Sequence, residues 1–76
     1  MNKERRDSIW HLASQLEALR SELEDIQHAE EEYRDNIPEN LQGSTRYEAA
    51  DEACDTLGEA VDGLEDIITS LEELAG

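Results

Sequence analysis

The sequence predicts an all-α protein, in which two long helices form an antiparallel helical hairpin and two hairpins dimerise into a four-helix bundle. Apolar residues recur in alternating steps of three and four along two segments, which is the spacing of one face of an α-helix. A short segment rich in turn-forming residues separates the two. The 76 residues make one domain, 1–76, near the lower size limit for a core of its own, so a second copy is expected to complete the core.

The first helix is predicted at about 3–35. Asn2 and Asp7 are both possible N-caps, since their side chains accept hydrogen bonds from amides of the first turn. Pro38 ends the helix, because the residue before a proline avoids the helical conformation. The apolar stripe of this helix consists of Ile9, Leu12, Leu16, Leu19, Leu23, Ile26, Tyr33 and Ile37, with Glu30 at the one polar position of the repeat.

The loop is predicted at 36–44, where the sequence NIPENLQGS contains proline, glycine and asparagine residues that favour turns. Ile37 and Leu41 are its large apolar residues. We expect both to fold back over the adjacent end of the core.

The second helix is predicted at about 45–75 and begins at Ser44 or Thr45. Thr45 and Glu48 have the spacing of a capping box, in which each side chain accepts a hydrogen bond from the backbone amide of the other residue. The apolar stripe of this helix consists of Tyr47, Ala50, Cys54, Leu57, Val61, Leu64, Ile68 and Leu71.

The two stripes match in an antiparallel register. Placing Tyr33 opposite Tyr47 sets Leu19 opposite Val61, and both stripes then end at the same end of the hairpin. This regular match predicts that the two stripes pack against each other as the core of the hairpin.

The second helix is apolar over a wider face than one seam needs. Bundle helices have such a face because each contacts two neighbours, so we expect a homodimer that forms a four-helix bundle. Gly58, beside the stripe, favours a close approach of the helices, whereas nothing in the sequence explains Gly63. The additional apolar positions, which recur every seven residues, are Ala53, Ala60, Ile67 and Leu74.

The formal net charge is −15, from 21 acidic and 6 basic side chains. This balance disfavours direct binding to nucleic acid or to an anionic membrane, both of which need clustered Lys and Arg. No apolar run is long enough for a signal peptide or a spanning helix, so a cytoplasmic location is expected. At the N-terminus, Lys3, Arg5 and Arg6 are predicted to lie beside Glu72 and Glu73 as surface ion pairs.

From Tyr47 onward the chain has ten acidic side chains and no basic one. One interpretation is a solvated surface that keeps a small bundle soluble. The other is a surface whose carboxylates imitate DNA phosphates and bind a basic protein partner. The predicted acidic face consists of Asp51, Glu52, Asp55, Glu59, Asp62, Glu65 and Asp66.

No arrangement of residues predicts catalysis or a cofactor. Cys54 suits a small apolar filler of the core, with an intersubunit disulfide or a reactive thiol as alternatives. Trp10, beside the stripe, suits a subunit contact, with a ligand site as the alternative. Glu30 suits a polar residue that fixes the register, with ligand binding or proton transfer as the alternative. A carboxylate-bridged metal centre needs several inward ligands, but Asp25 and His28 point away from the stripe.

The central segment resembles a group of short acidic proteins encoded by prophages and mobile elements of Gram-positive bacteria. The resemblance lies in Glu30-Glu31-Glu32-Tyr33, in Asn36-Ile37-Pro38-Glu39-Asn40-Leu41-Gln42 with Ser44, and in the alanine-rich acidic helix that follows. It implies a phage-like setting and no particular activity. The sequence thus favours a non-enzymatic, self-associating acidic interaction protein, and the alternative is a nucleic-acid mimic that inhibits a host defence or DNA-binding enzyme.

Overall fold

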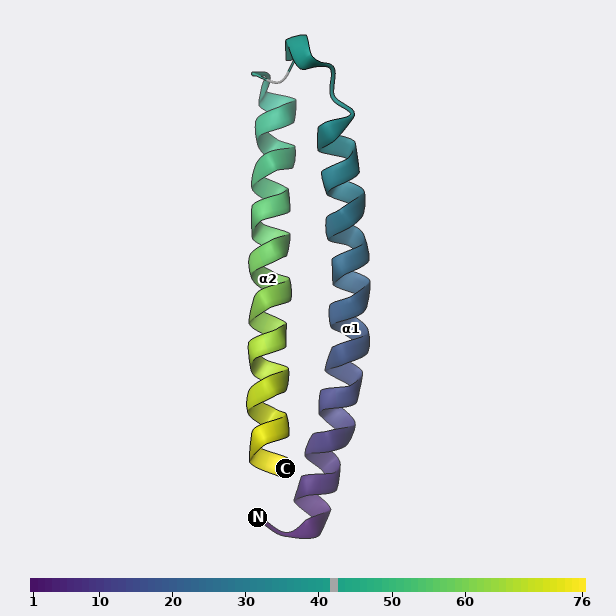
Figure 1. Ribbon diagram of the computed structural model, residues 1–76, viewed down its shortest axis with the longest axis vertical. Coiled ribbons are helices and arrows are strands. Elements are labelled where there is room, and N and C mark those ends of the chain that lie inside the picture. The colour runs from purple at the N-terminus through teal and green to yellow at the C-terminus, as the bar shows by residue number, and fades with distance from the viewer. Residues whose placement is uncertain (42) are drawn as a thin grey trace.

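Two long antiparallel helices make up nearly all of the protein. The computed structural model describes residues 1–41 and 43–76 and contains helix α1 (Lys3–Asp35), a one-turn 3-10 helix η1 (Glu39–Leu41) and helix α2 (Thr45–Ala75). The predicted all-α hairpin is confirmed, because α1 and α2 pack against each other and the described residues include no strand. Both chain termini lie at the same end of the hairpin, which we call the terminal end, opposite the loop end (Figure 1).

Local hydrogen bonds define both ends of α1. Asn2 is the N-cap, and its side-chain oxygen accepts a hydrogen bond of 2.9 Å from the backbone amide of Arg5. Asn36 is the C-cap, and its amide donates to the carbonyl of Glu32 at 3.0 Å. Pro38 follows two residues later, where its ring is incompatible with a continued helix.

Helix α2 begins at Thr45, within the start predicted at Ser44 or Thr45, but its cap differs from the predicted capping box. The hydroxyl of Ser44 accepts a hydrogen bond of 3.3 Å from the amide of Tyr47, so Ser44 is the N-cap. The predicted capping box of Thr45 and Glu48 is therefore wrong, because Thr45 is already the first helical residue.

One of the two apolar loop residues covers the core. Ile37 is buried, whereas Leu41 in η1 is 47% exposed, so the prediction that both fold back is wrong for Leu41. Gln42, part of the predicted loop, lies outside the described residues.

We define the seam as the residues that recur in steps of three and four along each helix and are buried or half-buried between them. The α2 side follows its predicted stripe and adds Ala75, but the α1 side differs from the prediction at every second position. The seam consists of Ile9, Ala13, Leu16, Arg20, Leu23, Gln27, Glu30, Arg34 and Ile37 on the N-terminal side of the chain, and of Tyr47, Ala50, Cys54, Leu57, Val61, Leu64, Ile68, Leu71 and Ala75 on the C-terminal side.

The hairpin buries little large apolar surface. None of the nine leucines, all of which lie in the described part of the chain, is buried. The accessible surface is 5524 Å², against about 4,700 Å² for a compact monomer of this mass. The radius of gyration is 17.3 Å, against about 11 Å for a compact chain of this length. The molecule is a rod of 59 × 14 × 13 Å with a narrow core.

Neither α1 nor α2 has a stretch both long and apolar enough to cross a membrane, and the same holds for the rest of the described chain.

Candidate functional site

Four large apolar side chains of α1 lie outside the seam. Leu12, Leu19, Ile26 and Tyr33 are 52%, 54%, 56% and 41% exposed. The sequence predicted them in the core between the two helices, and the hairpin corrects this prediction. The reason is a rotation of α1 that turns the next residue of each heptad toward α2 in their place, beginning with Ala13, which is 2% exposed.

The additional apolar positions of α2 are also uncovered. Ile67 and Leu74 are 51% and 60% exposed, Ala60 is exposed and Ala53 is half-buried. These residues recur every seven positions, as do the four of α1. Together the two sets form a surface that we call the open face, which consists of Leu12, Leu19, Ile26, Tyr33, Ala53, Ala60, Ile67 and Leu74.

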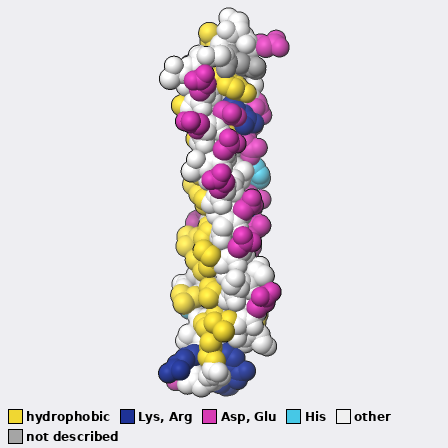
Figure 2. Space-filling view, turned by 90° about the vertical axis from the view of Figure 1, so that its left-hand side faces the viewer, with side chains coloured by type: hydrophobic (Ala, Val, Ile, Leu, Met, Phe, Trp, Pro, Cys, Tyr) yellow, Lys and Arg dark blue, Asp and Glu magenta, His cyan; other side chains and the backbone are white. Residues whose placement is uncertain are grey.

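The two halves of the open face lie on the same side of the hairpin. Each open-face residue directly precedes a seam residue, and in antiparallel helices this one-residue step turns toward the same side. A contact between the helices supports this geometry: Nε of Arg46, seven residues before Ala53, donates a hydrogen bond of 2.6 Å to the hydroxyl of Tyr33. Figure 2, which views the rod from the α2 side, shows a band of hydrophobic side chains along one edge over the half nearer the terminal end, with acidic side chains toward the other edge; near the loop end, acidic side chains lie on both edges.

The opposite side of the hairpin is polar. Arg20 donates to Glu17 at 2.6 Å and to Glu24 at 2.5 Å, and reaches Glu65 of α2 at 3.5 Å. The hydrogen bonds to Glu17, first, and to Glu24 raise the pKa of Arg20. The long arginine side chain thus covers one edge of the seam and carries its charge to the surface.

Arg34 repeats this arrangement near the loop end. It pairs with Asp35 at 3.1 Å and with Asp51 of α2 at 3.0 Å. The hydrogen bond from Arg34 to Asp35 is the main cause of a raised Arg34 pKa. Both seam arginines therefore bridge the helices on the side away from the open face. No feature of the apolar pattern predicted them in the seam.

The basic N-terminal cluster does not form its predicted ion pairs. Lys3, Arg5 and Arg6 were expected beside Glu72 and Glu73, yet within residues 1–41 and 43–76 all ion pairs within 4 Å belong to the two seam arginines. The reason is visible in Figure 1, where α1 extends beyond the C-terminal end of α2. The cluster leaves a basic patch at the terminal end of the rod (Figure 2).

The predicted acidic face lies outside the seam. Asp51 is half-buried beside Arg34, and the other six residues are exposed. All ten acidic residues of α2 fall at heptad positions away from the open face, which has none. The hairpin therefore has one apolar and one acidic side, and its acidic residues are Asp51, Glu52, Asp55, Glu59, Asp62, Glu65 and Asp66 with Glu48, Glu72 and Glu73.

Trp10 is 45% exposed, but it does not belong to the open face. It directly follows the seam residue Ile9, so its side chain turns toward the polar side of the hairpin. A contact made by Trp10 is therefore separate from any contact made by the open face.

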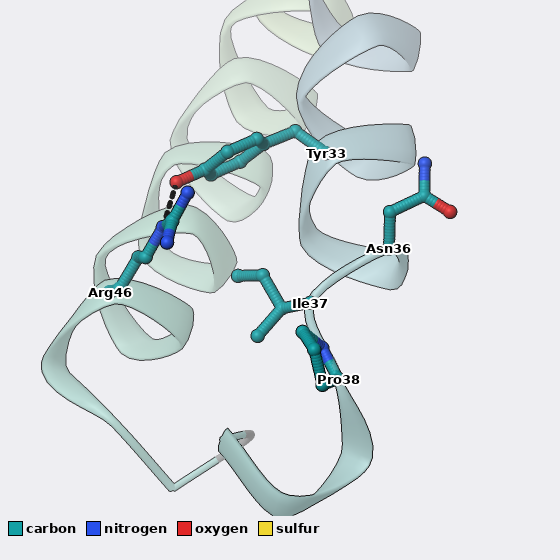
Figure 3. A pocket seen from close by; sticks show the side chains of 5 residues that line it. All are labelled: Tyr33, Asn36, Ile37, Pro38 and Arg46. Atoms are coloured by element: carbon teal, nitrogen blue, oxygen red, sulfur yellow. Dashed lines mark hydrogen bonds between the residues drawn. The ribbon is translucent and has the colours of Figure 1, made fainter.

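A shallow hollow of about 230 Å³ lies at the loop end. Figure 3 shows Tyr33 reaching from α1 toward Arg46 of α2, with Ile37 and Pro38 below them and Asn36 turned outward. The guanidinium carbon of Arg46 lies 5.5 Å from the centre of the Tyr33 ring, and the hydrogen bond to Tyr33 raises the pKa of Arg46. The hollow lies at the loop end of the open face. Its cation, the Arg46 guanidinium, already contacts the ring and the hydroxyl of Tyr33.

The remaining reactive residues do not converge. Cys54 is a free, buried seam residue, and burial raises the pKa of its thiol, with Arg34 acting in the opposite direction. His11 and His28 are exposed. Within the described chain, no three His, Cys, Asp or Glu side chains are arranged to hold a metal ion. Comparison with family models, with curated proteins and with solved structures finds no match for this chain.

Proposed function

We propose that this chain is a non-enzymatic protein that self-associates through its open face, forming a homodimeric four-helix bundle with an acidic outer surface. The single observation that carries the proposal is the open face itself. Eight uncharged positions, six of them occupied by large apolar side chains, recur every seven residues on one side of the hairpin, and all of them except the half-buried Ala53 are exposed.

The orientation of the helices supports a bundle. The apolar stripe of α1 is turned partly from the seam toward the open side, where Leu12, Leu19 and Ile26 lie, and the wider apolar face of α2 reaches the same side through its additional positions. In a four-helix bundle each helix contacts one helix of its own hairpin and one of the other, so its apolar stripe points between them. A lone hairpin gains nothing from such a rotation.

The exposed area has the size that a dimer interface needs. The chain exposes roughly 800 Å² more than a compact monomer of its mass. A specific interface of standard size buries about 800 Å² on each partner. A second copy of the same face, related by a twofold axis, covers this excess without any additional residue type.

The acidic side of α2 stays outside in such a bundle and is available to a basic protein. We propose the phage or mobile-element setting on the resemblance of the loop segment alone.

A second function, imitation of nucleic acid toward a DNA-binding enzyme, is favoured by one observation: the ten acidic residues of α2 all lie off the open face. For this function, the chain should inhibit such an enzyme at low salt, and replacing Asp55, Asp62 and Asp66 with asparagine should relieve the inhibition without altering the mass of the assembly.

Sedimentation equilibrium of the full chain tests self-association. We expect a species of twice the 8.6 kDa chain mass at micromolar concentration, in equilibrium with the monomer on dilution. A species of 8.6 kDa at all concentrations up to about 1 mM, where even a weak specific dimer forms, would contradict the proposal.

A further inference from the structure

We infer that the two hairpins dock antiparallel, with the loop end of one copy against the terminal end of the other. The inference rests on the proposed function, since it specifies how the two open faces meet. The twofold axis then runs across the rod, so that each helix of one copy lies over the same helix of the second copy. A parallel dimer would have its axis along the rod and would bring equal ends together.

The distribution of charge favours the antiparallel arrangement. The loop end, residues 30–52, carries eight acidic and two basic side chains, a net charge of −6. The terminal end, residues 1–8 and 70–76, carries four acidic and three basic side chains, a net charge of −1. Parallel docking would bring the two most acidic ends together, whereas antiparallel docking brings each of them beside the basic patch of the other copy.

The sizes of the open-face residues favour the same arrangement. On α2 the large Ile67 and Leu74 lie toward the terminal end, and the small Ala53 and Ala60 lie toward the loop end. Antiparallel docking sets Leu74 of one copy against Ala53 of the other, and Ile67 against Ala60. On α2 each large side chain then meets a small one, while the α1 residues, all of them large, meet one another, so every level of the interface contains one alanine and three large side chains. Parallel docking would lay α2 over α1 of the other copy, so that all four alanines lie toward the loop end and both copies of Ile67 and Leu74 lie toward the terminal end, which makes the packed volume uneven along the rod.

Gly63 gains an explanation in this geometry. The midpoint of the α2 positions 53–74 falls between Gly63 and Leu64, so the twofold axis passes beside Gly63. A Cβ on Gly63 would meet nothing within 4 Å in the hairpin, so no contact of the hairpin requires glycine there. At the axis, the Gly63 residues of the two copies lie side by side, and the absence of a side chain lets the two α2 helices approach closely.

Distances between spin labels test the inference on the full chain. In a Cys54→Ala background, one label is attached at Ser8→Cys, near the terminal end, and in a separate variant at Ser21→Cys, near the middle of α1. Both positions are exposed. With a rise of 1.5 Å per residue, antiparallel docking separates the two Ser8 labels by about 44 Å along the rod and the two Ser21 labels by about 5 Å along it. Parallel docking leaves both pairs within roughly 25 Å of each other.

The two label positions separate the failure of the inference from the failure of the proposed function. A short distance at position 21 with a distance of about 44 Å or more at position 8 supports antiparallel docking. Short distances at both positions mean parallel docking, which overturns the inference and leaves the dimer intact. The absence of any distance within range at position 21 at high protein concentration means that the faces do not meet, which overturns both.

Discussion

Replacing Leu19 with glutamine should weaken dimerisation while leaving the hairpin intact. Leu19 is 54% exposed and lies on the open face, beside the seam but not in it. Burying a whole leucine side chain is worth about 1.5–3 kcal/mol, so covering the exposed half contributes about 1 kcal/mol. A dimer covers two copies, and the loss of about 2 kcal/mol raises the dissociation constant roughly 30-fold.

Leu41→Gln is the matched control. Leu41 is 47% exposed, nearly as much as Leu19, and the chemical change is the same, but Leu41 lies in η1 and not on the open face. Sedimentation equilibrium over a dilution series gives the dissociation constant of each variant, and circular dichroism above that concentration gives its helix content. Equal dissociation constants for the two variants would refute the reasoning, because exposure alone, and not position on the open face, would then decide the effect.

Four further outcomes follow from the described contacts. Glu22→Gln should lower the dissociation constant of the dimer about two- to five-fold. An antiparallel axis places the Glu22 residues of the two copies side by side, and the substitution removes about 0.5–1 kcal/mol of repulsion between them; an unchanged constant would argue for parallel docking. Raising sodium chloride from about 50 to 500 mM should also strengthen the dimer, since salt screens repulsion between two chains of net charge −15, whereas binding of a basic partner should weaken in the same titration. Gly63→Ala should raise the helix content of the monomer, because alanine stabilises a helix by about 1 kcal/mol relative to glycine. The same substitution should weaken the dimer, because the added methyl group crowds the contact between the two α2 helices. Its control, Gly43→Ala in the loop, should leave the dissociation constant unchanged. Burial raises the pKa of the Cys54 thiol above that in the unfolded chain, so the folded state favours the neutral thiol. The free energy of unfolding, measured with urea, should therefore fall as pH rises above about 8.5. It should fall less in Cys54→Ala.

The hairpin was predictable because its signals are local and repeated. The heptad spacing indicates two helices, and the turn-forming segment around Pro38 separates them. One detail needed coordinates: the choice of Ser44 over Thr45 as N-cap depends on which hydroxyl faces the free amides, and both residue types are good caps.

The rotation of α1 was not predictable from apolar spacing. A stripe of leucines indicates which face of a helix avoids water, but not how that face is divided between two neighbours. Ala13 signals the division, since a small residue permits the close approach that makes it the most buried of the core residues. Arg20 and Arg34 give no apolar signal, because they enter the seam through their aliphatic stems while their charged ends reach Glu65 and Asp51. The division of the stripe decides the open face, so the candidate site emerged only with the structure.

No leucine is buried in the hairpin, and all nine lie among the described residues. Under the proposed function, the stability of the chain therefore depends on its concentration in the cell. If the open faces pair as proposed, a chain below the dissociation constant buries less apolar surface than a paired one and spends more time open to proteases. Above that concentration, the paired chains would protect one another, and the melting temperature would rise with protein concentration. Expression level would then act as a threshold: a small change in synthesis rate would separate rapid turnover from accumulation of a durable rod.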